Sequence, residues 1–160
     1  MLMRLKNMFN ISVIGLGYVG LPLAIELSKF FEVTGYDVNK KRINNLRKGL
    51  DNNNDIKSKF LKSSNIKFSS NHNDIKDSNV YIITVPTPIL KNNKPNLFFL
   101  KKAFEDISKL LSKGNLVILE STVYPGLTEK LANHYFDKKI GFKLNIDYFL
   151  GYSPERIILE

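Results

Sequence analysis

The sequence predicts an α/β fold, a doubly wound parallel sheet with helices on both faces. Short apolar runs alternate with segments whose apolar residues recur at helical spacing, which is typical of parallel strands joined by crossover helices. A cluster of glycines at residues 15–20 directly follows the first apolar run, where a strand must turn into a helix. Right-handed crossovers then give the strand order 3-2-1-4-5-6, with a ligand crevice at the carboxyl ends of the strands.

Six strands are expected, at residues 10–14, 32–37, 66–69, 80–84, 116–120 and 148–152. The strand at 80–84 is the strongest candidate for burial after the first one. It must end at the Val-Pro-Thr-Pro segment 85–88, because proline cannot donate to a strand ladder.

The first expected helix runs from the glycine cluster to residue 30, and three of its apolar residues share one face: Val19, Leu23 and Leu27. Asn39 is suited to cap a second helix, because its short side chain accepts a hydrogen bond from a helical N–H group. Gly49 ends that helix, as glycine commonly does.

The polar segment 51–64 is expected to be a surface excursion with one loose helical turn. An amphipathic helix is expected at 97–111. Pro125 is suited to the first turn of the last helix, at 125–136, because a first turn does not need the N–H group that proline lacks.

The glycine cluster, Gly15-Leu16-Gly17-Tyr18-Val19-Gly20, matches a turn that binds a dinucleotide. Glycine is needed where the backbone turns tightly, where it touches a diphosphate and where the helix packs on the strand. The following helix aims its N–H groups and dipole at the phosphates. Asp37 ends the second strand, where a carboxylate accepts hydrogen bonds from a ribose diol and repels a 2′-phosphate. These residues predict an NAD site that prefers NAD to NADP.

Composition bounds the class of protein. The 160 residues, 43% of them hydrophobic, are enough for one domain with a core. The net charge is +9, but the basic residues are scattered among asparagines, so we expect no nucleic-acid partner. No apolar run approaches the roughly 20 residues of a membrane span, and the absence of cysteine fits a reducing cytoplasm. The isolated His72 and His134 suggest no metal site.

Four ordered motifs resemble the N-terminal domain of the UDP-glucose/GDP-mannose dehydrogenase family, the nucleotide-sugar 6-dehydrogenases. They are GLGYVGLPLA at 15–24, VPTP at 85–88, ESTVYPG at 120–126 and GYSPER at 151–156. The last two most resemble the branch that oxidises UDP-N-acetylhexosamines rather than UDP-glucose. The resemblance implies a Rossmann-like NAD-binding domain at 9–160, after a short extension at 1–8.

The resemblance also implies a reaction, in which NAD oxidises the C6 alcohol of a UDP-sugar twice, through an aldehyde and a cysteine-bound thioester, for surface polysaccharide synthesis. Thr122 would order a catalytic water and Glu155 would assist as a base. Glu155, Arg156 and Ile157 would touch the substrate. The implied cofactor contacts are Gly15, Gly17, Tyr18, Val19, Gly20, Asp37, Arg42, Thr87, Ser121 and Thr122.

Thioester chemistry needs a thiolate, and this sequence has no cysteine. The family's central dimer-forming helix and UDP-binding domain are also expected to lie outside it. We therefore expect the chain to bind NAD without completing the reaction alone, and the full-length enzyme to be a homodimer. Two alternatives stay open: an NAD-binding regulatory module without chemistry, and a dehydrogenase of the 6-phosphogluconate or 3-hydroxyacyl-CoA type.

Several of the implied site residues also have plainer interpretations. Thr87 could satisfy a carbonyl group between two prolines, and Ser121 or Thr122 could cap the next helix. Arg42 could be a solvated cation in the first turn of its helix, and Glu155 could form a surface salt bridge.

Overall fold

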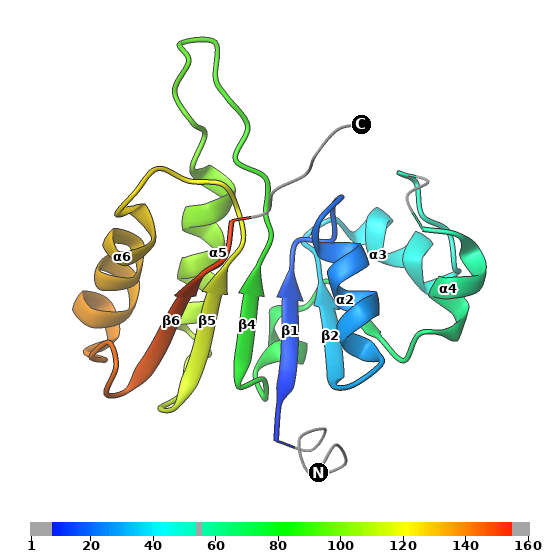
Figure 1. Ribbon diagram of the computed structural model, residues 1–160, viewed down its shortest axis with the longest axis horizontal. Coiled ribbons are helices and arrows are strands. Elements are labelled where there is room, and N and C mark those ends of the chain that lie inside the picture. Colours follow the sequence, from blue (N-terminus) through cyan, green and yellow to red (C-terminus); the bar gives the residue numbers. More distant parts are fainter. Residues whose placement is uncertain (1–7, 54–55, 155–160) are drawn as a thin grey trace.

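The structure is a computed structural model that describes residues 8–53 and 56–154. Its centre is a six-stranded sheet in the order β3-β2-β1-β4-β5-β6 (Figure 1). Every neighbouring pair of strands is parallel, so all carboxyl ends lie at one edge. The predicted doubly wound sheet and its strand order are confirmed.

The strands are β1 (Asn10–Ile14), β2 (Glu32–Tyr36), β3 (Lys67–Ser69), β4 (Val80–Ile83), β5 (Asn115–Leu119) and β6 (Tyr148–Tyr152). Each lies within one residue of its predicted range. Asp37, Thr84 and Glu120, which were expected to close three strands, instead begin the loops that follow them. This shift places their side chains at the carboxyl edge of the sheet.

The helices are α2 (Gly20–Ser28), α3 (Lys40–Arg47), α4 (Ser58–Ser63), α5 (Phe98–Ser108) and α6 (Leu127–Ala132), with a short 3-10 helix, η1 (His72–Ile75), and a π-helical turn, η2 (Asn133–Lys138). Asn39 caps α3 as predicted, because its side-chain oxygen accepts from the backbone N–H of Arg42 at 3.1 Å. Within the described residues, no helix is long and apolar enough to cross a membrane.

Different helices cover the two faces of the sheet. Apolar side chains of α2, α3 and α4 form one cluster, and those of α5 and α6 form another. β4 supplies both clusters by the alternation of a strand: Val80 and Ile82 belong to the first, and Tyr81 and Ile83 to the second. Burial on both faces explains why this strand is a continuous apolar run.

The most buried side of α2 lies next to the face that Val19, Leu23 and Leu27 share. Val19, Leu23 and Leu27 are only partly buried, and they lie at the margin of the contact. The reason is Gly20, which allows one side of the helix to approach the sheet so closely that this side becomes the buried one. The buried residues of α2 are Gly20, Leu21, Ala24, Ile25 and Ser28.

Two expectations are wrong in detail. Pro125 precedes α6 and does not enter its first turn, because Gly126 adopts a left-handed conformation (φ 82°) directly before Leu127. The segment 51–64 includes the expected helical turn, α4, but it is not all surface. The carboxylate of Asp51 is completely buried.

Candidate functional site

Three loops form most of the wall of a cavity of about 570 Å³ at the carboxyl edge of the sheet. They are the glycine turn after β1 and the loops after β4 and β5, and they meet where the ligand crevice was expected, at the carboxyl ends of the strands. Six of the predicted cofactor residues line this cavity: Gly17, Tyr18, Val19, Thr87, Ser121 and Thr122. The sequence pattern therefore located this cavity at the carboxyl edge of the sheet.

The three glycines of the turn serve different purposes. Gly15 has φ 95°, in the left-handed region that residues with a side chain rarely adopt. A Cβ atom on Gly20 would overlap the carbonyl oxygen of Gly15 and the hydroxyl oxygen of Thr84, so Gly20 permits the close packing of helix on strand. A Cβ atom on Gly17 would meet no atom within 4 Å. Gly17 thus leaves room on the cavity side of the turn.

Asp37 holds the glycine turn from the end of β2. One carboxylate oxygen accepts from the backbone N–H of Leu16 at 2.9 Å, and the other accepts from the N–H of Asn39 at 2.8 Å. A carboxylate has about four acceptor sites, so the same group has capacity for two more hydrogen bonds. The ribose contact of Asp37 stays a prediction, and the structure adds a second role in shaping the turn.

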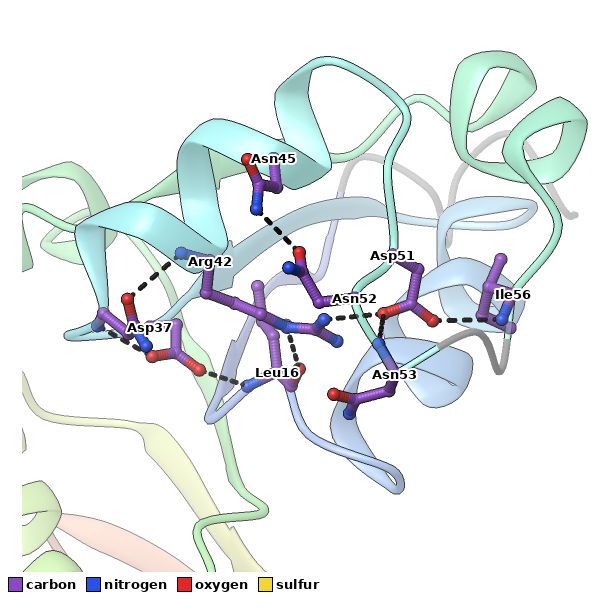
Figure 2. Close-up of polar contacts among 9 residues, drawn as sticks. Leu16, Asp37, Arg42, Asn45, Asp51, Asn52, Asn53 and Ile56 are labelled. Atoms are coloured by element: carbon purple, nitrogen blue, oxygen red, sulfur yellow. Dashed lines mark hydrogen bonds and ion pairs between the residues drawn. The ribbon is translucent and has the colours of Figure 1, made fainter.

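Arg42 lies beneath the same turn with 9% of its surface exposed (Figure 2). Its Nε donates to the carbonyl oxygen of Leu16 at 2.9 Å, and its Nη1 donates to Asp51 at 2.6 Å. The interpretation of Arg42 as a solvated cation is therefore wrong. Its Nη2 is buried and has no hydrogen-bond partner among the residues that the structure describes.

Asp51 is the buried counterion of Arg42, and the sequence did not reveal it. Besides Nη1 of Arg42, its carboxylate accepts from the backbone N–H groups of Asn53 at 3.2 Å and Ile56 at 3.0 Å (Figure 2). Burial alone would raise the pKa of Asp51, but the hydrogen bonds from Arg42, Ile56 and Asn53 outweigh it and lower the pKa. Asp51 is therefore ionised at neutral pH.

Hydroxyl groups tie the loops after β4 and β5 together. Ser121 donates from Oγ to the carbonyl oxygen of Val85 at 2.6 Å, and Thr87 donates from Oγ1 to the carbonyl oxygen of Thr122 at 3.0 Å. Neither Ser121 nor Thr122 caps α6, because Gly126 occupies the cap position. The plain interpretation of Thr87 as a partner of a carbonyl group is confirmed, although the same residue also lines the cavity.

A second cavity, of about 270 Å³, adjoins the first at Val85, which lines both. Its wall is largely apolar. The lining residues include Tyr36, Val38, Val85, Phe98 and Phe99, together with Lys102 and Asp106 of α5. The sequence analysis missed this cavity. The available signal was the pair Phe98-Phe99 at the start of an amphipathic helix, since adjacent residues cannot both face the same core. Phe98 is 66% exposed and Phe99 40%.

Three predicted site residues lie outside the described residues. They are Glu155, Arg156 and Ile157. Their proposed roles as base and substrate contacts stay predictions. The strand that precedes them, β6, ends at Tyr152 beside Leu119 of β5, so the chain reaches the carboxyl edge of the sheet before residue 155.

The fold and the site together define a class of protein. A glycine turn after β1, an acidic residue after β2 and cavities where the strand order reverses are the features of a dinucleotide-binding domain. This class leaves the chemistry open, because the same fold serves many dehydrogenases.

Comparisons with known proteins identify the family. Residues 9–159 match the UDP-glucose/GDP-mannose dehydrogenase family, NAD binding domain, and the chain belongs to this family. It is 49% identical over 149 residues to the UDP-N-acetyl-D-glucosamine 6-dehydrogenase of Pseudomonas aeruginosa. It is 45% identical over 148 residues to the protein CapL of Staphylococcus aureus. Each alignment covers 92% of this chain and 35% of the relative, so the chain spans about a third of their length.

A solved structure agrees with the family match. The UDP-D-ManNAc dehydrogenase from Pyrococcus horikoshii has a TM-score of 0.85 and 34% sequence identity, covering 92% of this chain and 36% of that one. The family, its N-acetylhexosamine branch and the NAD cofactor, all predicted from the four motifs, are confirmed. The alternative of a 6-phosphogluconate or 3-hydroxyacyl-CoA dehydrogenase is wrong, because the match is to a different family.

Proposed function

We propose that NAD binds in extended form across the carboxyl edge, with its adenosine in the apolar cavity and its nicotinamide in the larger one. The observation that carries this placement is Val85, which lines both cavities. A Cβ atom on Gly15 would lie 3.1 Å from the Cα atom of Val85, so the glycine turn lies against the junction. A dinucleotide that fills both cavities must cross this turn with its diphosphate.

The residues at the junction fit the diphosphate and the adenosine ribose of the cofactor. Gly17 leaves open space where the diphosphate would approach the backbone. Asp37 has acceptor sites for a ribose diol beside the apolar cavity. Arg42 lies beneath the turn and lines neither cavity, and its Nε donates to the carbonyl oxygen of Leu16 at 2.9 Å, so it supports the turn from below. Gly17 and Asp37 therefore suit the diphosphate and the adenosine ribose of NAD.

We infer that the chain is the cofactor-binding part of a cytoplasmic enzyme that oxidises the C6 alcohol of a UDP-N-acetylhexosamine. The names of its relatives support this substrate class.

Bound NAD supplies the hydride acceptor. Thr122, exposed in the wall of the larger cavity, would orient a water molecule, and Glu155 would accept its proton. A thioester step needs a thiolate that this cysteine-free sequence does not contain. The family resemblance further suggests a homodimer.

The test is turnover by the complete product of the gene. NADH formation is followed at 340 nm with UDP-N-acetylglucosamine, UDP-N-acetylmannosamine and UDP-glucose, alongside the 160-residue chain. We expect two NADH per sugar with an N-acetylhexosamine, and NAD binding without turnover for the 160-residue chain. NAD binding by the complete product with no oxidation of any UDP-sugar would instead favour a regulatory module.

A further inference from the structure

Asn53 lines the larger cavity, although it comes from none of the three loops that form most of its wall. It belongs to the segment between α3 and α4, and it shares the cavity wall with Gly17, Tyr18 and Val19. The neighbouring Asn52 turns the other way (Figure 2), and its side-chain oxygen accepts from Nδ2 of Asn45 on α3 at 2.7 Å. Two adjacent asparagines therefore differ in which side they face.

A buried network fixes the position of Asn53 relative to the glycine turn. The backbone N–H of Asn53 donates to Asp51, which pairs with Arg42, which donates to the carbonyl oxygen of Leu16 (Figure 2). The side chain of Asp51 is fully buried and that of Arg42 is 9% exposed. Because both charges are out of water, separating them is costly. Asn53 is therefore linked to the glycine turn through Asp51 and Arg42.

The chemistry of Asn53 suits the part of the wall that it joins. The start of α2 carries a partial positive charge from its helix dipole, and its first turn has no acidic residue. An asparagine amide adds two N–H donors without adding charge. Donors on both sides of the crossing point can bind phosphate oxygens of one diphosphate.

We propose that Asn53 is a further cofactor-contacting residue whose amide donates to the diphosphate of the dinucleotide, and that Asp51 is the positioning residue that holds it there through Arg42. This inference rests on the proposed placement of NAD across the glycine turn. It assigns a function to a polar segment that the sequence marks only as surface.

Calorimetric titration of the 160-residue chain tests the contact. Asn53→Ala is expected to weaken NAD and ADP about tenfold each, the loss of one hydrogen bond to a charged group, with an unchanged melting temperature. Asn52→Ala is the matched control and should bind as the wild type does. Equal affinities for Asn53→Ala and Asn52→Ala would overturn the proposal. A loss for NAD but not for ADP would overturn the diphosphate assignment, because ADP lacks the nicotinamide half.

A double-mutant cycle tests the positioning role at a temperature where every variant is folded. Asp51→Asn should weaken NAD binding, and adding Asn53→Ala should weaken it little further. Fully additive losses would overturn the role of Asp51. Asp147→Asn is the control. Asp147 also forms an ion pair, with the exposed Lys113 at 2.8 Å, but it precedes β6 at the opposite edge of the sheet, so this substitution should leave NAD affinity unchanged. No NAD binding by the wild type would instead refute the proposed function itself.

Discussion

Gly17 and Gly20 stand three residues apart in one turn, and the structure predicts opposite consequences for the same substitution at each. A methyl group on Gly20 overlaps the carbonyl oxygen of Gly15 and the hydroxyl oxygen of Thr84, whereas a methyl group on Gly17 meets no atom within 4 Å. Gly20→Ala should therefore impair stability. Gly17→Ala should spare stability and impair cofactor binding.

The magnitude for Gly20→Ala follows from what must move. The N–H of Gly15 donates to the carbonyl oxygen of Tyr36 at 2.8 Å, and Thr84 donates to the carbonyl oxygen of Gly15 at 2.6 Å. Overpacking costs about 1–3 kcal/mol, and a strained hydrogen bond adds about 1 kcal/mol. Alanine returns about 0.5–1 kcal/mol through its helix preference. The net loss is about 1–3.5 kcal/mol, or roughly 2–14 °C in melting temperature for a domain of this size.

For Gly17→Ala the free energy of unfolding should change by less than about 1 kcal/mol, because the added methyl group has open space around it. NAD affinity should fall at least about tenfold, since the methyl group occupies the proposed diphosphate position. Differential scanning fluorimetry measures the first effect and calorimetric titration the second. The reasoning fails if Gly17→Ala binds NAD like the wild type, or if Gly20→Ala melts at the wild-type temperature.

Three more predictions concern other parts of the fold. Asp51→Asn should lower the free energy of unfolding by about 3 kcal/mol at pH 7, because it leaves the buried Arg42 uncompensated. Since the pKa of Asp51 is lowered in the folded state, its stabilising contribution is present above about pH 4 and is lost at lower pH. An equal loss of unfolding free energy at pH 7 and pH 3 in urea unfolding would contradict this reasoning. Tyr148→Phe removes the 2.8 Å hydrogen bond to Asp137 and should lower the free energy of unfolding by about 1.5 kcal/mol, and an unchanged urea midpoint would rule this out. Phe99→Ala should weaken ADP binding about fivefold by removing a ring from the adenosine cavity; undiminished affinity would place the adenosine elsewhere.

Local sequence patterns predicted the features that depend on neighbouring residues. The strands, their order and the turn at Gly15 follow from apolar runs, chain direction and the special backbone of glycine. Asp37 was found in the same way, because its place at the end of an apolar run is visible in the sequence. Its bonds to Leu16 and Asn39, which make it part of the turn, depend on how two strands lie side by side.

Features that depend on distant contacts were not predicted. Asp51 stands in a polar tract that has no periodicity, so nothing marked it as the buried partner of Arg42. The most buried side of α2 was not predicted, because helical spacing gives several equivalent stripes and the close approach at Gly20 selects among them. The apolar cavity was missed because Val38 and Phe99 come from separate elements that meet only in the folded sheet.

The most direct test of the account is a calorimetric titration of this chain with NAD and with NADP, using Asp37→Ala as the control. The account predicts saturable binding of one NAD per chain, weaker binding of NADP because Asp37 repels the 2′-phosphate, and loss of affinity in the variant. Absence of both heat and thermal stabilisation at millimolar NAD would contradict the site. Equal affinity for NAD and NADP would contradict the ribose contact of Asp37.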